Sequence, residues 1–244
     1  MSVPNEHFAG DVLADLSLWL KRLEKTSMGN LKFNIKRNHE IWNDVNVWEN
    51  DGEEWSTHFE TTDKLWDEVI LPRVGSLIKG SVLEIAPGRG RMTRKLLEAN
   101  IDLEILDLSD TCIQRCLERY GDRISGYHVG NGKDLRAIES NSKDLVFSFD
   151  SFVHMHEEVI DSYLEEISRV LKSGGWCWIH HANIQQGNDD NFKNVAGRSN
   201  MDINKFRKLS EEYGFEIIQQ DLIKWEASGN PEWLRDGLSL IKKI

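Results

Sequence analysis

The sequence predicts an α/β fold built on an open, doubly wound, mostly parallel sheet. Two observations support it: short β-rich runs alternate with helical patterns from residue 80 onward, and those helical patterns have the length of about 10–15 residues typical of βαβ crossovers. Such alternation implies parallel strands joined by right-handed connections. Because ligands of these sheets bind at the carboxyl ends of the strands, each candidate residue below is considered by its distance from a strand end.

The chain before residue 76 has a different composition, with five of the nine tryptophans before residue 70. Apolar residues at helical spacing predict an amphipathic helix over residues 8–25, whereas residues 30–55 show no clear period and are expected to be rich in loops. A second helical pattern surrounds Leu65 and Ile70, and Pro72 can kink it. We expect residues 1–75 to form a helical and aromatic cap or lid over a sheet domain spanning residues 76–244.

The strands and helices of the sheet domain follow in a regular order. Lys172–Gly175 is expected to end one helix, and Gly214 stands where the residue after a helix end favours glycine. The predicted strands cover residues 81–86, 102–108, 124–129, 144–149, 176–181, 215–225 and 237–243. The predicted helices cover residues 91–100, 110–120, 157–171 and 202–213.

Composition excludes several classes of protein. With 39% apolar and 29% charged residues the chain suits a soluble globular protein, and no apolar run approaches the roughly 18 residues that a membrane span needs. A net charge of −11 disfavours non-specific binding to nucleic acid. No basic segment followed by an apolar stretch begins the chain, so we expect no secretory signal. Cys112 and Cys116, four apart on a predicted helix, suit reduced buried thiols and therefore the cytoplasm.

The turn after the first strand carries the strongest chemical signal. Gly88 and Gly90 allow a tight turn and close approach of a ligand to the backbone. A dinucleotide fingerprint would place a third glycine at position 93, where this chain has Thr93. Glu84 lies just before the turn and would repel phosphates but attract an ammonium group, while Asp107 ends the second strand, where it can bind ribose hydroxyls. The pattern favours a nucleoside with a cationic amino-acid tail over a dinucleotide.

This E-x-A-P-G-x-G pattern, followed by an acid at the end of strand two, resembles the cofactor site of class I S-adenosylmethionine-dependent methyltransferases. The resemblance extends from about residue 40 to the C-terminus and implies a seven-stranded sheet whose last strand is antiparallel, with residues 76–244 as the cofactor-binding domain. The flanking pieces are similar to a bacterial group associated with sugar and surface-polysaccharide modification. These pieces are Glu53–Ser56, Ile70–Arg73, Ser148–His154, Ile179–Asn183 and Arg198–Met201.

The resemblance also assigns roles to individual residues. It implies that the ribose is bound by Asp107 and that Asp150, at the end of strand four, lies beside the methyl group. The methionine part would be held by Glu84, Ala86, Gly88 and Gly90, and the adenine by Asn131, Gly132 and Asp134. The chain departs from the family pattern at Ala86-Pro87, where proline removes a backbone donor and so can change the affinity for the cofactor.

Histidines at the ends of strands four and five are the candidate bases. Methyl transfer to a hydroxyl requires removal of a proton, and histidine titrates near neutral pH. His154 is the first choice, oriented by Asp150 if that residue is not engaged with the cofactor. His181 is the second choice, and together with Asn183 it can bind and position the acceptor hydroxyl, although strand alternation sends His180 and His181 to opposite faces. The alternative for each histidine is a structural role, in which it caps a strand or satisfies a buried backbone group.

The same cluster offers ligand types for a divalent metal in Asp150, His154, His156 and His181. Magnesium prefers oxygen ligands, and this cluster is rich in nitrogen. No metal site is therefore predicted, although a divalent metal stays possible.

Two further residues are candidates for binding the acceptor. Trp55 can stack on the apolar face of a sugar ring. Arg198 lies in the polar stretch 185–201, which resembles a substrate lid, and can bind a phosphate or carboxylate. The alternatives are that Trp55 packs the N-terminal part onto the sheet and that Arg198 is a solvated surface residue.

The leading hypothesis is an O-methyltransferase that consumes S-adenosylmethionine, releases S-adenosylhomocysteine and modifies a hydroxyl of a sugar or glycoconjugate precursor. Methylation of nitrogen or of another small molecule is the first alternative, and a non-catalytic subunit with the same fold is the second. A nicotinamide dehydrogenase is disfavoured by Thr93 and Glu84. The sequence leaves the acceptor, the position methylated and the oligomeric state open.

Overall fold

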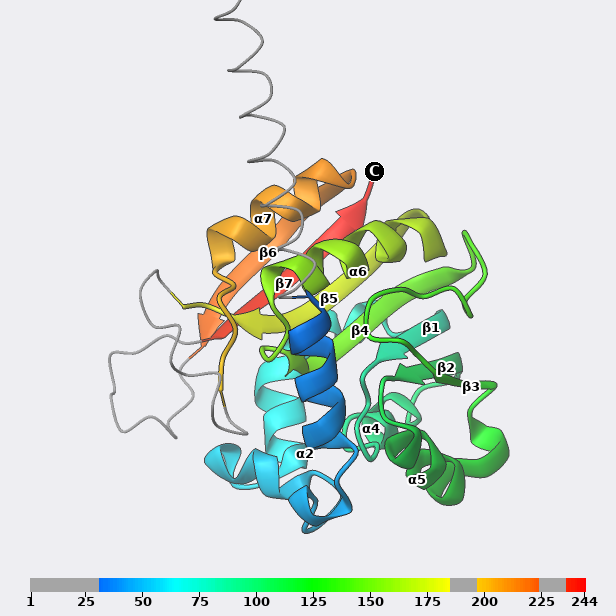
Figure 1. The fold of residues 1–244 in the computed structure, drawn as a ribbon. Coiled ribbons are helices and arrows are strands. Elements are labelled where there is room, and N and C mark those ends of the chain that lie inside the picture. Colours follow the sequence, from blue (N-terminus) through cyan, green and yellow to red (C-terminus); the bar gives the residue numbers. More distant parts are fainter. Residues whose placement is uncertain (1–30, 185–196, 224–235) are drawn as a thin grey trace, which may run out of the picture.

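A computed structural model describes residues 31–184, 197–223 and 236–244 (Figure 1). Within these residues the strands form one seven-stranded sheet of order β3-β2-β1-β4-β5-β7-β6. Strand β7 pairs antiparallel with β5 and β6, and the other neighbours are parallel. The predicted doubly wound sheet with an antiparallel last strand is thus confirmed. The strands are β1 Gly80–Ile85, β2 Ile101–Asp107, β3 Gly126–Val129, β4 Lys143–Phe152, β5 Leu171–Ala182, β6 Phe215–Ile223 and β7 Asp236–Lys243.

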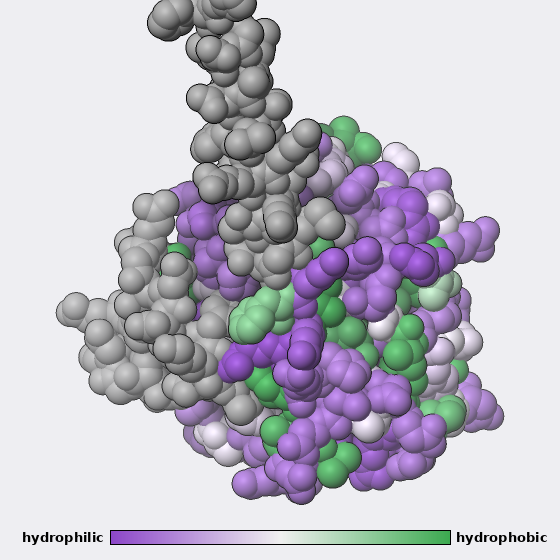
Figure 2. Space-filling model, in the orientation of Figure 1, coloured by the Kyte–Doolittle hydropathy of each residue, from purple (hydrophilic) through white to green (hydrophobic). Residues whose placement is uncertain are grey.

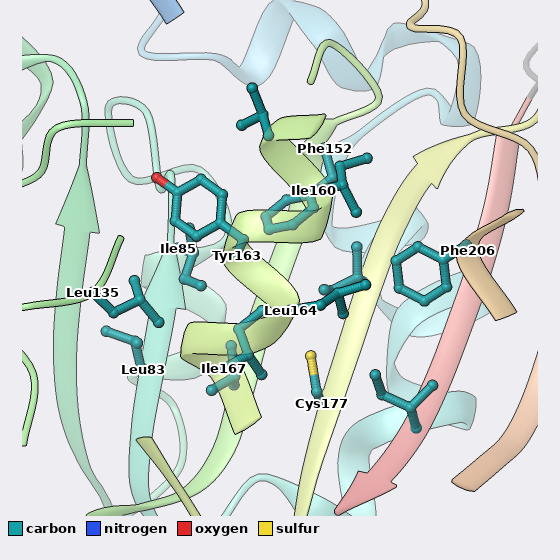
Figure 3. Packing of buried hydrophobic residues seen from close by; sticks show 14 of the residues in the cluster. Leu83, Ile85, Leu135, Phe152, Ile160, Tyr163, Leu164, Ile167, Cys177 and Phe206 are labelled. Carbon is teal, nitrogen blue, oxygen red and sulfur yellow. The ribbon is translucent and has the colours of Figure 1, made fainter. Parts of the chain in front are cut away.

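Helices cover both faces of the sheet, as Figure 1 shows. On one face α6 (Glu157–Val170) and α7 (Ile203–Glu212) bury an apolar cluster, and Figure 3 shows Ile160, Tyr163 and Leu164 of α6 pointing toward the strands. On the other face a second cluster joins the strands to α5 (Asp110–Tyr120) and to residues 62–74. Central strands buried on both faces explain why their sequences read as nearly continuous apolar runs. Hydrophilic residues dominate the face seen in Figure 2, where hydrophobic residues reach the surface in small separate areas.

Residues 31–42 are helical, so the expectation of a loop-rich stretch was wrong there. Leu31 and Ile35 pack on the core, but the same helix face also carries Asn34 and Asn38. Asn34 is only 1% exposed and bonds to backbone atoms of the segment that follows β4. Asparagines on the inward face hide the helical period, because a search for apolar spacing counts them as solvent-facing.

Two other helices differ from expectation. The helix predicted over residues 91–100 is shortened to α4 (Thr93–Leu96), because the chain must turn back into β2, which begins at Ile101. The helix around Pro72 is α2 (Thr62–Leu65), a π-helical turn η3 (Trp66–Ile70) and α3 (Leu71–Val74). The wide turn directly precedes the proline, whose missing N–H cannot continue the regular ladder.

Several expectations fall outside these observations. The helix predicted over residues 8–25 lies outside the described residues, and the domain boundary at residue 75 stays a prediction. Residues 62–74 contribute Leu65, Trp66 and Ile70 to the core of the sheet. Among the helices that the structure describes, none has the length and apolar character needed to cross a membrane.

Candidate active site

A cavity of about 360 Å³ opens at the carboxyl ends of β1, β2 and β4, where the fold predicts a ligand. Its floor is the turn after β1, and its roof comes from the helix at residues 31–42 and from η2 (Glu53–Phe59). The residues that line it and carry the argument below are Trp42, Trp48, Gly52, Trp55, Glu84, Ala86, Gly88, Arg91, Asp107, Asp150, His154 and Arg198.

The turn after β1 adopts backbone conformations that exclude side chains. Gly88 and Gly90 have φ of +58° and +90°. A Cβ atom on Gly88 would lie 2.7 Å from Trp48 Cη2, and one on Gly90 would lie 2.6 Å from Tyr120 Cε2. Ala86, at the point where the sequence departs from the family pattern, has φ of +56°, a conformation that costs a non-glycine residue about 1–2 kcal/mol. The turn is therefore held in a strained shape that brings its backbone to the cavity.

Glu84 and Asp107 present two buried carboxyl groups to this cavity. Burial, reinforced by the charge of Asp107, raises the pKa of Glu84 to about 8, although Thr93 Oγ1 donates a 2.6 Å hydrogen bond to it. Burial likewise raises the pKa of Asp107 to about 6, against the N–H donors of Gly88 at 3.0 Å and Ser109 at 2.8 Å. Carboxyl groups buried without a full charge partner favour a cationic ligand or hydroxyl donors.

Asp150 occupies an irregular end of β4. Its φ is +62°, and the pairing of β4 with β5 shifts register between Ser148 and Phe152. Burial opposes ionisation of Asp150, but the charges of Arg91 and Arg198 outweigh it and keep its pKa below the ordinary value. Arg91 Nη2 donates to Asp150 Oδ2 at 2.8 Å, which holds an ionised carboxylate near the carboxyl end of β4.

His154 lines the cavity and has a defined tautomer. Its Nδ1 lies 2.7 Å from the carbonyl oxygen of Gly197, which can only accept, so Nδ1 carries the proton and Nε2 is an acceptor. Burial and the charge of Arg198 lower the pKa of His154 to about 4. The Trp42 ring packs 5.1 Å from the imidazole. His154 is therefore neutral at physiological pH.

The second candidate base and its partner lie elsewhere. His181 stacks on Phe206 of α7 at 4.1 Å, with Nε2 2.8 Å from Ser239 Oγ. Asn183 Oδ1 accepts from Ile203 N–H at the start of α7. The helix that covers this face of the sheet thus occupies both side chains, and neither lines the cavity. His180, on the opposite face, accepts at Nδ1 from the N–H of Asp150.

The segment predicted to contact adenine is only partly at the cavity. Asn131 Oδ1 accepts the N–H of Lys133 and Asp134, and Arg136 pairs with Asp134, whose pKa it lowers. Asn131 and Asp134 do not line the cavity. Gly132 borders an adjoining hollow of about 30 Å³, where a Cβ atom on it would meet Ile35 Cγ2 at 2.8 Å. The helix at residues 31–42 thus comes close to the expected adenine region.

Of the three residues predicted to bind the acceptor, Trp55 and Arg198 line the cavity and Asn183 does not. Arg198 is buried rather than solvated and forms a bidentate pair with Asp236 at 2.7 and 2.8 Å. Trp55 stands edge-on to Trp42 at 6.3 Å. Its Nε1 is buried and has no hydrogen-bond partner among the residues that the structure describes.

Arg91 is the main functional candidate that sequence reasoning missed. It lines the cavity and bridges Ser56 Oγ at 3.0 Å and Asp150 at 2.8 Å. The available signal was an arginine directly after the second glycine of the turn. Within the described ranges no group of three His, Cys, Asp or Glu side chains is arranged to hold a metal ion.

The sheet order and the cavity define the Rossmann-like fold of class I methyltransferases. Residues 83–179 match the family described as a methyltransferase domain. These residues therefore resemble a methyltransferase domain, and the solved structures described below share its fold. This match says nothing about the predicted similarity to a sugar-modifying group.

Among curated proteins, the chain is similar to phosphoethanolamine N-methyltransferase 1 from Zea mays. The two are 29% identical over 134 residues, which is 52% of this chain and 26% of that protein. The chain thus spans about a quarter of the length of the curated relatives it matches.

Two solved structures share the fold. One, from Galdieria sulphuraria, is assigned as a sarcosine dimethylglycine methyltransferase; it has a TM-score of 0.58 and 18% identity over 86% of this chain and 98% of that chain. The other is magnesium protoporphyrin IX methyltransferase from Synechocystis with S-adenosylmethionine bound, with a TM-score of 0.61 and 11% identity over 86% of this chain and 97% of that chain. Their names cover different acceptors, so this likeness concerns the fold.

Proposed function

We propose that this cavity binds S-adenosylmethionine and that the chain transfers the methyl group to an acceptor held beside Asp150 and His154. The supporting observation is the pair of buried carboxyl groups, Glu84 and Asp107, at neighbouring strand ends around a turn that excludes side chains. These residues fit the cofactor, because Glu84 suits its ammonium group and Asp107 suits its ribose hydroxyls. When bound, the cofactor supplies a methyl group on a positively charged sulfur.

For the acceptor, we infer a hydroxyl whose proton is received by His154 Nε2. The Nδ1–H bond to Gly197 fixes the ring and leaves Nε2 as the acceptor. A pKa of about 4 makes His154 a weak base, but the hydroxyl becomes strongly acidic as its oxygen gains the methyl group. A weak base that stays neutral beside a cationic cofactor can therefore still assist. Asp150 contributes negative charge near the sulfur.

We further propose a sugar or glycoconjugate precursor as the source of this hydroxyl. The wall formed by Trp42, Trp48 and Trp55 supports this choice, because flat aromatic rings stack on the apolar face of a pyranose. The quoted similarity of residues 53–56 and 198–201 to the sugar-modifying group points the same way. The three buried thiols favour a reducing compartment, and we propose the cytoplasm.

Methylation of an amine is the second candidate. Tryptophan rings beside carboxylates also suit a cationic amine, and the curated relatives named above act on phosphoethanolamine. An amine that reaches the cavity unprotonated needs little help from a base, so this reaction would depend weakly on His154.

The test uses S-adenosylmethionine with an isotopically labelled methyl group and two acceptor panels, one of sugar precursors and one of small amines. We expect a labelled methyl on a carbohydrate, detected by mass spectrometry, and a fall in rate of about 100-fold or more in His154→Gln. His156→Gln, in the same segment but outside the cavity lining, is the matched control and is expected to keep the wild-type rate.

Label on an amine with an unchanged rate in His154→Gln would establish the second candidate instead. A chain that fails to bind S-adenosylhomocysteine in calorimetry would be a non-catalytic subunit, and the proposed function would be wrong.

A further inference from the structure

Arg91 is a buried cation that its protein partners satisfy only in part. Its side chain is 8% exposed and lines the cavity. A guanidinium has five N–H donors, and two of them are used, by Ser56 Oγ and Asp150 Oδ2. No other acceptor is present for the rest among the residues described here. Because Arg91 lines the cavity, its unused N–H groups can donate to a ligand there.

Trp55 supplies a second, independent donor at the same place. Its buried Nε1 has no acceptor within the described part of the chain, whereas the Nε1 of neighbouring Trp48 donates to the carbonyl of Trp42. A Cβ atom on Gly52 would lie 3.5 Å from Arg91 Cβ and 3.7 Å from Trp55 Cδ1, the ring carbon bonded to Nε1. Arg91 and Trp55 therefore flank one glycine at the wall of the cavity.

We propose that Arg91 and Trp55 Nε1 form an anion subsite in this cavity, and that the anion is a carboxylate. Both groups only donate, and a guanidinium with a neighbouring N–H matches the two oxygens of a carboxylate. The proposal rests on the proposed function, because two sources of a carboxylate would enter such a cavity: the amino-acid tail of the cofactor, or an acceptor with an acidic group.

The cofactor tail is the better-placed source. Glu84 lies near enough for the positive charge of Arg91 to lower its pKa in opposition to burial. An ammonium group at Glu84 and a carboxylate at Arg91 would then belong to one zwitterion, each end meeting the opposite charge. This arrangement gives Trp55 a role toward the cofactor, in place of the stacking role predicted from the sequence.

Calorimetry with two ligands tests the subsite in the chain of 244 residues. S-adenosylhomocysteine carries the amino-acid tail, and 5′-methylthioadenosine lacks it. In Arg91→Met we expect the affinity for S-adenosylhomocysteine to fall about 10- to 100-fold, the range for a hydrogen bond to a charged group. The affinity for 5′-methylthioadenosine should stay within about twofold of wild type. Arg94→Met, in the same connection but outside the cavity lining, is the matched control and should bind both ligands normally.

A second titration tests whether the carboxylate bound at Arg91 belongs to the acceptor. Acetate is added to wild-type protein and to Arg91→Met, each saturated with S-adenosylhomocysteine. If only wild type binds acetate, and both proteins bind S-adenosylhomocysteine equally well, the subsite exists and belongs to the acceptor. If Arg91→Met changes neither titration, the subsite is refuted. Wild-type protein that binds neither adenosyl ligand refutes the proposed function, and the acetate titration without them then decides the subsite.

A folding defect in Arg91→Met would leave Trp55→Phe as the deciding variant, because it removes the N–H and keeps the ring. We expect its affinity to fall at least about threefold for S-adenosylhomocysteine relative to 5′-methylthioadenosine, and an equal effect on both ligands would contradict the subsite. Trp66→Phe, at a buried tryptophan outside the cavity lining, is the ring-matched control and should change neither affinity.

Discussion

Replacing Glu84 with glutamine separates the charge of this residue from its shape. The pKa of Glu84 is raised to about 8 by burial, against an ordinary value of 4.5. Between these pH values the unfolded chain holds fewer protons at this site than the folded chain, so the free energy of unfolding falls as pH rises. The two pKa values differ by about 3.5, which corresponds to at most about 5 kcal/mol at pH above 8.

Glutamine at position 84 keeps an oxygen for the Thr93 hydroxyl and removes the titration. We therefore expect Glu84→Gln to be more stable than wild type above pH 8, by up to several kcal/mol, and the gain to shrink toward pH 4. Urea unfolding at a series of pH values measures this difference. Equal pH dependence in the two proteins would show that Glu84 ionises as it does in water.

The same substitution is expected to weaken binding of the cofactor. An ammonium group at Glu84 favours the carboxylate, so binding at pH 7 should release close to one proton from wild type. Asp107, with a pKa of about 6, is already mostly ionised at that pH and should release about a tenth of a proton. Calorimetry of S-adenosylhomocysteine in buffers of different ionisation enthalpy counts these protons.

For Glu84→Gln we expect almost no proton release and an affinity about 10- to 100-fold lower at pH 8. The reasoning about the two carboxyl groups fails if wild type releases no proton, or if Glu84→Gln binds as tightly as wild type at pH 8.

Two further substitutions test the surroundings of the cavity. Gly88→Ala adds a Cβ atom 2.7 Å from Trp48 at a φ of +58°. We expect the free energy of unfolding, measured with urea, to fall by about 1–3 kcal/mol and cofactor binding to be lost. Wild-type behaviour would mean that the turn is loose. Asp236→Asn removes the carboxylate that forms the bidentate pair with the buried guanidinium of Arg198, so the free energy of unfolding, measured by thermal unfolding, should fall by about 3–5 kcal/mol. A change below about 1 kcal/mol in Asp236→Asn would indicate that water reaches Arg198.

The sequence specifies those parts of the fold that depend on local pattern. Alternating strands and helices, together with the glycine turn, placed β1, β2 and the cavity correctly. Glu84 and Asp107, singled out as acids near the ends of the first two strands, both line the cavity, and their roles toward a cofactor stay predictions. The helix at residues 31–42 was not predicted because Asn34, which is buried, and Asn38, which is partly buried, interrupt its apolar period while they donate hydrogen bonds to the carbonyl of His154.

The expectation for His181 differs from the structure because it depends on which face of the sheet a helix covers. Strand alternation separates His180 from His181 but does not say which face is packed by a helix. Helix α7 covers His181, so this histidine is engaged with Phe206 and Ser239. Arg91 was not predicted, because its proposed role depends on N–H groups that remain without a protein acceptor in the folded chain. Spacing along the sequence does not reveal such groups.

The distribution of cavity residues along the chain bears on acceptor choice. Glu84, Asp107, Asp150 and His154 lie within residues 83–179, the stretch that matches the methyltransferase domain. The aromatic wall, from Trp42 to Trp55, precedes this stretch, and Arg198 follows it. In the proposed function most contacts to the cofactor therefore come from residues 83–179, and the flanking segments complete the cavity, joined to it by bonds such as that between Arg91 and Ser56. Proteins similar over residues 83–179 alone can share the cofactor and differ in acceptor, so acceptor choice is expected to follow the flanking segments.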